Sequence, residues 1–273
     1  MLAIDTTSTP AAGLDQAQIE SFDSDGYVVI PRFFDASECE ALKADIDATK
    51  QRDSPRRFLC EYPALGPLIS EPRVMDAVTA VLGQGFAFHH LHAARHDAGT
   101  TGVHWHQDYE QAPQTNRSHK MVHFFYYLNG LNGEIGDLLV LPKSQHMVVD
   151  NDGLRILGTE NLPGMVVVDD LPPGSAVLVH SALWHARRAK PGGEYRPRYF
   201  ADASYCQAGI RWPAPGNPQR REYLARAREL GLDRGGKYAH LFDEAHFFED
   251  PVARAFLKHK QGSLVLEMQG WTE

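Results

Sequence analysis

Residues 173–185 read Pro-Gly-Ser-Ala-Val-Leu-Val-His-Ser-Ala-Leu-Trp-His. The Pro-Gly pair is typical of a turn, and the apolar run that follows it, residues 175–180, predicts a short buried strand. Similar runs, separated by Gly, Pro, Asn and Asp, lie at residues 86–91, 121–128, 137–141, 165–168 and 199–205. Many short strands without helices between them predict a β-sandwich or β-barrel.

Helices are predicted on both sides of this β-rich region. The pattern Ser37-Glu38-Cys39-Glu40 predicts a capping box, in which Ser37 accepts from the Glu40 N–H and Glu40 reaches back. A strand ending at a proline is predicted over residues 26–31. The predicted helices cover residues 15–24, a segment opening at Ser37, and residues 73–82, 218–230 and 244–258.

The composition is that of an ordinary globular protein. The chain has 273 residues, of which 43% are hydrophobic and 23% charged, and its formal net charge is −8. This charge, with no compensating basic run, argues against nucleic acid or an anionic membrane as the main partner. Three cysteines without metal-type spacing predict free thiols. No signal pattern or bilayer-length apolar run is evident, so we expect a cytoplasmic protein; the oligomeric state is not readable from the sequence.

A candidate metal motif precedes the second strand run, at His104-Trp105-His106-Gln107-Asp108. Alternate side chains of an extended strand point to the same side, so His106 and Asp108 are expected to project together, with His104 on the same face. A His-x-Asp pair with a distant histidine is the ligand set of a non-haem Fe(II) facial triad. With fourteen histidines in the chain, the pair alone is a weak signal.

The distant ligand and its basic companion each have two candidates. His180 ends the predicted strand and His185 follows it five residues later. Arg196 and Arg198 both precede the aromatic strand, and strand alternation places them on one side. A basic residue after the distal histidine suggests a co-substrate that carries a carboxylate.

Four ordered blocks carry a resemblance to a known family. They are residues 23–30 (Asp-Ser-Asp-Gly-Tyr-Val-Val-Ile), residues 133–146 (Gly-Glu-Ile-Gly-Asp-Leu-Leu-Val-Leu-Pro-Lys-Ser-Gln-His), residues 173–185, and Arg196-Pro197-Arg198 leading into Tyr199-Phe200. From about residue 19 to residue 205 the chain resembles the phytanoyl-CoA dioxygenase (PhyH-like) family of Fe(II)/2-oxoglutarate-dependent oxygenases.

The resemblance implies a fold and a set of site residues. The fold is mainly β with flanking helices, a double-stranded β-helix (cupin-like jelly roll). Carried over by position, the ligands of Fe(II) are His106, Asp108 and His185, and Arg198 binds the distal carboxylate of 2-oxoglutarate. Phe125 lies near a position that flanks the co-substrate. The expected organisation is a disordered tail over residues 1–14 and one oxygenase domain over residues 15–273, with N-terminal helices and first strand (15–85), jelly-roll core (86–205) and C-terminal helical extension (206–273).

The implied activity is oxidation by O2, most simply hydroxylation, of a C–H bond of a small-molecule metabolite, with release of succinate and CO2. Asp108 is intact, whereas related halogenases replace this ligand with a small residue. The chain departs from the family at Ala186-Arg187-Arg188, where the family usually has Gly-Ser-Gly. Two other functions stay open: a catalytically silent cupin-like small-molecule binding protein and a Zn(II) hydrolase. Residues 209–236 are expected to cover part of the pocket mouth.

Overall fold

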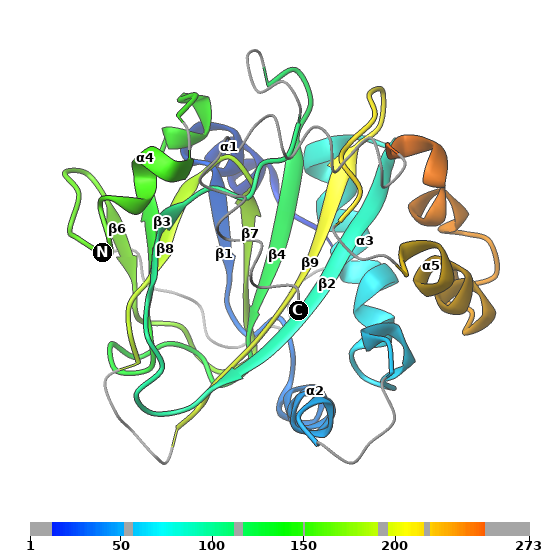
Figure 1. Ribbon diagram of the computed structural model, residues 1–273, viewed down its shortest axis with the longest axis horizontal. Helices are drawn as coiled ribbons and strands as arrows, with labels where there is room; N and C mark the ends of the chain where they lie inside the picture. Colours follow the sequence, from blue (N-terminus) through cyan, green and yellow to red (C-terminus); the bar gives the residue numbers. More distant parts are fainter. Residues whose placement is uncertain are drawn as a thin grey trace.

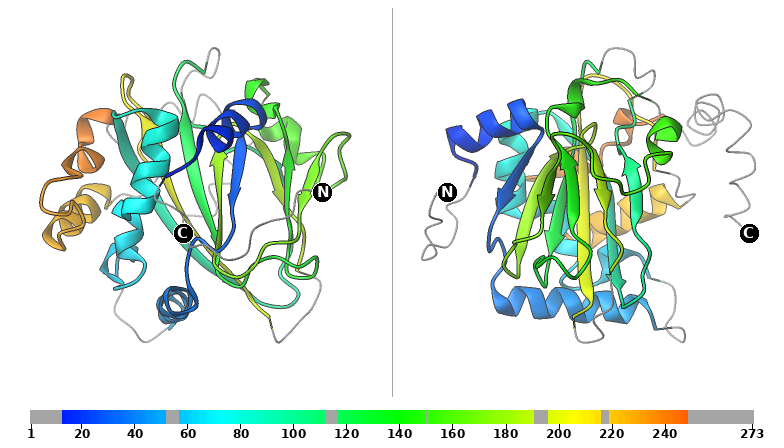
Figure 2. Two further views of the ribbon diagram at one scale, coloured as in Figure 1. Left: turned by 180° about the vertical axis from the view of Figure 1, so that it is seen from behind. Right: turned by 90° about the vertical axis from the view of Figure 1, so that its left-hand side faces the viewer.

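Two antiparallel β-sheets face each other in the computed structural model, and helices cover the outer face of the larger sheet (Figure 1; Figure 2). The structure describes residues 13–51, 57–111, 117–149, 151–190, 196–215 and 219–248. The larger sheet has the order β1 (Tyr27–Ile30), β7 (Ser175–His180), β4 (Met121–Tyr127), β9 (Arg198–Gln207) and β2 (Phe86–His96). The smaller sheet has the order β3 (Val103–His106), β8 (Trp184–Arg187), β5 (Leu138–Leu141) and β6 (Val166–Val168). This arrangement confirms the predicted jelly roll.

Strand β4 explains how the larger sheet is covered on both faces. All of its residues, Met121–Tyr127, are buried. Phe124 and Tyr126 pack with the helices on the outside, whereas Phe125 and Tyr127 point between the two sheets and pack with residues of the smaller one. A strand that is buried on both faces needs a continuous apolar run instead of alternation, which is the pattern that this segment of the sequence shows.

Four α-helices flank the larger sheet: α1 (Gln16–Asp25), α2 (Ala36–Thr49), α3 (Pro72–Leu82) and α5 (Arg220–Glu229). The predicted capping box at Ser37 and Glu40 is wrong by two residues. The cap of α2 is Asp35, whose carboxylate accepts from the Glu38 N–H at 2.8 Å, while the Glu38 carboxylate accepts from the Asp35 N–H at 2.8 Å. The Ser37 hydroxyl donates to Asp35 at 2.7 Å instead of capping the helix. A carboxylate thus takes the N-cap position.

The observed bounds of most core strands lie within two residues of those predicted from the sequence. The run at residues 175–180 is confirmed as β7, while β2 extends five residues beyond the predicted end. Between Phe88 and Leu91 the register of β2 against β9 shifts. Such a bulge bends the strand and redirects its side chains. A short helix, α4 (Asn151–Arg155), lies against β3.

The C-terminal extension packs on the back of β2. The Arg220 guanidinium donates to the carbonyls of His89 at 2.6 Å and Phe88 at 3.0 Å, and stacks on the Phe247 ring at 4.1 Å. The first residue of helix α5 therefore binds the backbone of β2 at its bulge. In the predicted segment 244–258, a 3-10 helix spans Glu244–His246, and residues 249–258 lie outside the described part, as do residues 1–12 of the predicted tail. Among the described residues, no helix is long and apolar enough to cross a membrane.

The turn before β7 leaves no room for a side chain at Gly174. Its φ is +78°, and an added Cβ would lie 2.2 Å from the Phe34 carbonyl oxygen. We expect Gly174→Ala to lower the free energy of unfolding by roughly 2–5 kcal/mol, the sum of left-handed strain and overpacking. Gly133→Ala is the control, because Gly133 has φ +83° but no atom within 4 Å of the added Cβ. Urea denaturation measures the free energy of unfolding of both variants. Equal losses of stability in the two would contradict the contribution from overpacking against Phe34.

Candidate active site

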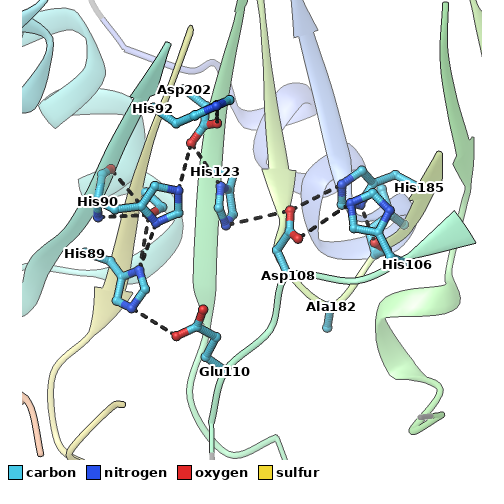
Figure 3. A network of polar contacts seen from close by, with 12 residues as sticks. His89, His90, His92, His106, Asp108, Glu110, His123, Ala182, His185 and Asp202 are labelled. Atoms are coloured by element: carbon cyan, nitrogen blue, oxygen red, sulfur yellow. Dashed lines mark hydrogen bonds and ion pairs between the residues drawn. The ribbon is translucent and has the colours of Figure 1, made fainter. Parts of the chain in front are cut away.

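Two histidines and one aspartate meet between the sheets, at one end of the smaller sheet. His106 on β3 pairs directly with His185 on β8. The distance from Asp108 Oδ1 to His106 Nε2 is 3.6 Å, and from Asp108 Oδ2 to His185 Nε2 3.3 Å. Their ligand atoms all lie within 4.8 Å of one another, and the side chains point toward one another (Figure 3). We call His106, Asp108 and His185 the triad.

The backbone holds Asp108 in place although β3 ends at His106. The Asp108 N–H donates to the Ser181 carbonyl at 2.7 Å, and the Ser181 N–H donates to the Met121 carbonyl at 2.8 Å. The segment after β3 is thereby fixed to the link between β7 and β8. The carboxylate thus reaches the two imidazoles from a loop, whereas simple strand alternation would have placed it on β3.

Both imidazoles of the triad are oriented through their second nitrogen. His106 Nδ1 lies 2.7 Å from the His104 carbonyl, and His185 Nδ1 lies 3.0 Å from the Leu183 carbonyl. A carbonyl can only accept, so each Nδ1 carries the proton and each Nε2 presents its lone pair toward Asp108. Metal-binding histidines are commonly oriented in this way, so the donor set fits a divalent ion.

The charges in the triad also fit a cation. Burial would raise the pKa of Asp108, but the imidazoles of His185 and His106 outweigh it and keep this pKa well below its usual value. Burial, with a contribution from His185, lowers the pKa of His106 to about 4. Burial would also lower the pKa of His185, but Asp108 raises it. A charged carboxylate that attracts a proton to the neighbouring Nε2 attracts a metal ion to the same place.

His180, the other candidate for the distant ligand, is not part of this group. Its ring packs between Phe22 and Tyr109, with centroids 6.1 and 6.0 Å away, and its Nδ1 accepts from the Ala182 N–H at 3.1 Å. Burial, with contributions from Lys120 and Arg117, lowers its pKa to about 3. His180 is therefore a neutral packing residue in the folded protein.

This low pKa predicts an acid-sensitive contribution to stability. The unfolded chain takes up a proton on His180 near its ordinary pKa of about 6.5, whereas the folded chain resists it until about pH 3. Stability is then fully present above pH 6.5 and falls as the pH drops toward 3, by at most about 1.4 kcal/mol per pH unit. We expect His180→Asn, whose amide oxygen can accept from Ala182, to flatten this dependence in urea denaturation of the metal-free protein. The exposed His146→Asn is the control, and parallel curves for wild type and His180→Asn would contradict the assignment.

Two arginines, Arg187 and Arg198, line the same cavity as the triad. Arg198 is only 4% exposed, and its guanidinium stacks on the rings of Phe200 at 4.6 Å and Tyr127 at 5.1 Å. Burial lowers its pKa, and burial together with Arg198 lowers the pKa of Arg187 to about 10. Arg198 Nε and Arg187 Nη1 are buried and have no hydrogen-bond partner among the described residues. A buried and a half-buried cation with unused donors form a fitting site for an anion such as a carboxylate. Arg196, the alternative, is exposed.

The triad and both arginines line one cavity of about 330 Å³. Phe125 is part of its wall, with its ring 5.6 Å from that of His185. The expectation that residues 209–236 cover the mouth is not met, because none of the described residues of that segment lines the cavity. They pack on the outside, where Trp212 contacts Tyr109 and Arg220 holds β2. The cavity wall consists of His90, His92, His96, Val103, His106, Asp108, Glu110, His123, Phe125, Tyr127, Leu138, His185, Ala186, Arg187, Arg198, Phe200 and Asp202.

Arg187, the residue that departs from the usual hydroxyl residue of the family that the sequence resembles, reaches the cavity with its side chain. Other polar residues of the wall were not identified from the sequence: His90, His92, His96, Glu110, His123 and Asp202. Period-two spacing was the available signal: His90, His92 and His96 alternate along β2, as Arg198, Phe200 and Asp202 alternate along β9.

Two imidazoles and a carboxylate inside a double-stranded β-helix, with a buried cationic anchor in the same cavity, define the class of non-haem iron oxygenases that use 2-oxoglutarate. The comparison with family models agrees. The chain belongs to the phytanoyl-CoA dioxygenase (PhyH) family, whose model matches residues 22–196. It is accordingly an Fe(II)/2-oxoglutarate-dependent oxygenase, with Fe(II), 2-oxoglutarate and O2 as its cofactor and co-substrates.

Solved structures with the same fold are distant in sequence. HygX from Streptomyces hygroscopicus with nickel and 2-oxoglutarate bound is 19% identical, with a TM-score of 0.59 over 72% of this chain and 89% of that one. The carbocyclase SnoK from nogalamycin biosynthesis, described as non-heme and alpha ketoglutarate dependent, is 16% identical, with a TM-score of 0.61 over 78% and 90%. EctD from S. alaskensis with 2-oxoglutarate and 5-hydroxyectoine is 20% identical, with a TM-score of 0.57 over 75% and 80%. No curated protein sequence matches the chain.

Proposed function

We propose that this protein hydroxylates a C–H bond of a small polar metabolite, with iron bound by His106, Asp108 and His185 and 2-oxoglutarate bound by Arg198. The observation that carries the proposal is the convergence of two Nε2 lone pairs on the Asp108 carboxylate inside a closed β-fold. When the iron and 2-oxoglutarate are bound, oxidative decarboxylation to succinate and CO2 takes up one oxygen atom of O2 and makes the other available to the substrate.

The residues of the chain have separate roles in this proposal. Arg198 orients the co-substrate through its distal carboxylate, and Arg187 adds positive charge beside it. The rings of Phe125 and Phe200, with centroids 5.4 Å apart, exclude water between the arginines and the triad. The hydrogen bonds of His106 and His185 to backbone carbonyls fix the two rings, so that the donor atoms need no rearrangement when the ion binds.

The size and lining of the cavity support a small, polar substrate. A volume of about 330 Å³ is at the lower end of the usual range for ligand pockets, and 2-oxoglutarate would fill part of it. The wall beyond the triad carries imidazoles and the carboxylates of Glu110 and Asp202, which suit hydroxyl or amino groups better than a long acyl chain. The EctD structure of similar fold contains 5-hydroxyectoine, a small polar molecule.

The proposal is tested by turnover of the purified protein with Fe(II), 2-oxoglutarate and O2. We expect succinate and CO2 to form slowly without a substrate and faster with a suitable polar metabolite. Anaerobic addition of 2-oxoglutarate to the Fe(II) protein should produce a charge-transfer absorption band, which zinc cannot give. A band without any succinate formation would favour a silent binding protein, and the absence of both would refute the proposal.

A further inference from the structure

A second group of metal-ligand side chains lies in the same cavity, around the carboxylate of Asp202 (Figure 3). Its members come from three neighbouring strands of the larger sheet: His90 on β2, Asp202 on β9 and His123 on β4. Each residue offers one nitrogen or oxygen atom, and these atoms lie within 4.8 Å of one another. We call these three residues the Asp202 group.

The spacing in the Asp202 group is that of the triad. Asp202 Oδ1 lies 3.3 Å from His90 Nε2 and 3.4 Å from His123 Nδ1, and Asp202 Oδ2 lies 3.4 Å from His92 Nδ1. The corresponding distances in the triad are 3.3 and 3.6 Å. Good N–H···O hydrogen bonds measure about 2.7–3.2 Å. Separations of 3.3–3.4 Å also match two ligand atoms that each lie about 2.0–2.2 Å from one ion.

His123 has a ring that lies between two carboxylates. Its Nδ1 is 3.4 Å from Asp202 Oδ1, and its Nε2 is 4.0 Å from Asp108 Oδ2 and has no hydrogen-bond partner among the described residues. A neutral imidazole carries one N–H, so one of its nitrogens must turn a lone pair toward a carboxylate. A cation beside Asp202 removes this conflict, because it accepts the lone pair of Nδ1 and leaves the Nε2–H to face Asp108.

The charge of Asp202 and the orientation of His90 also fit a bound cation. The Asp202 side chain is 8% exposed, and its ion-pair partners in the described part of the chain are imidazoles only. A buried carboxylate needs a compensating charge. His90 Nδ1 lies 2.8 Å from the Ser204 hydroxyl, so its ring is fixed and its Nε2 is directed at Asp202.

We propose that His90, His123 and Asp202 bind a second divalent cation beside the iron site, linked to it through His123 and Asp108. Two nitrogen ligands and one carboxylate suit Zn(II) and similar transition metals, whereas Mg(II) and Ca(II) require oxygen ligands. Three protein ligands leave at least one position open toward the cavity for water or an oxygen donor of a ligand, as in catalytic metal sites.

The test is the number of Zn(II) ions that the full-length, metal-free protein binds with and without Mg(II) in excess, in the presence of a chelator that removes weakly held surface zinc. We expect two equivalents for the wild type and one for each of Asp202→Asn and Asp108→Ala. Replacing one ligand should weaken that equivalent by more than the roughly 100-fold that loss of an outer-shell partner can cost. Co(II) substitution adds a visible absorption spectrum for each site.

A matched control separates ligation from general charge. Glu110 is a carboxylate of the same cavity, but it pairs with His89 at 3.1 Å and lies outside the Asp202 group, so Glu110→Gln should keep both equivalents. His90→Gln, at a side chain 33% exposed, provides a second ligand variant if Asp202→Asn does not fold. A wild type with one equivalent that only Asp108→Ala removes would overturn the second site and leave the proposed function intact. Loss of zinc in Asp202→Asn alone would instead support the second site and count against the triad.

Discussion

Asp108→Ala is expected to abolish 2-oxoglutarate turnover and to release the iron from the triad. Asp108 supplies the one negative charge between His106 and His185, and its carboxylate faces both Nε2 atoms at 3.3–3.6 Å. The affinity for Fe(II) should fall by more than the roughly 10- to 100-fold that the loss of an outer-shell partner costs. Succinate formation, metal content and the anaerobic charge-transfer band measure the effect together.

His104→Ala is the matched control for this prediction. His104 lies on β3 two residues before His106 and is not part of the cavity wall, and its contribution to the triad is the backbone carbonyl that accepts from His106. The substitution removes an imidazole from the same strand and keeps that carbonyl, so iron binding and turnover should persist. Equal losses in His104→Ala and Asp108→Ala, or iron retained by Asp108→Ala, would contradict the assignment of the ligands.

Arg198→Ala is expected to raise the KM for 2-oxoglutarate by roughly 30- to 4000-fold. Truncating one partner of a buried, hydrogen-bonded charge pair costs about 2–5 kcal/mol, and about 1.4 kcal/mol corresponds to a tenfold change in affinity. If Arg198 binds the co-substrate equally in the ground and transition states, kcat at saturation changes much less than KM. Arg198→Lys should give an intermediate effect, because lysine keeps the charge but not the planar pair of donors.

The control for Arg198 is Arg196→Ala, two residues earlier and exposed. Its KM for 2-oxoglutarate should match that of the wild type. Titration of the Fe(II) protein with 2-oxoglutarate under argon gives the binding constant without turnover. An unchanged binding constant in Arg198→Ala would show that the co-substrate carboxylate lies elsewhere, with Arg187 as the remaining arginine of the cavity wall.

The sequence predicted the parts of the site that depend on local pattern. His106 and Asp108 lie two residues apart, and the turn and strand before His185 are recognisable without coordinates. The choice between Arg196 and Arg198 could not be made from alternation, because both fall on one side. It depends on where β9 begins, and β9 begins at Arg198 because that residue pairs with His96 of β2, a contact between segments about a hundred residues apart.

The Asp202 group could not be predicted, because it too depends on contacts between strands that lie far apart in the sequence. Fourteen histidines cannot be sorted by spacing alone, and His90, His123 and Asp202 become neighbours only through the order of β2, β9 and β4 in the sheet. The register shift between Phe88 and Leu91 also changes which side chains of β2 face the cavity. Bulges and sheet order follow from tertiary pairing, which no local pattern records.

The position of β9 between two earlier strands of the larger sheet bears on how the protein is made in the cell. This strand ends at Gln207, yet it lies between β4 and β2, whose last residues are Tyr127 and His96. During synthesis β2 and β4 leave the ribosome long before the strand that lies between them exists, so β2 has no strand partner in this sheet until about 200 residues have been translated. We therefore expect nascent chains that stop before β9 to expose these strands and to depend on chaperones.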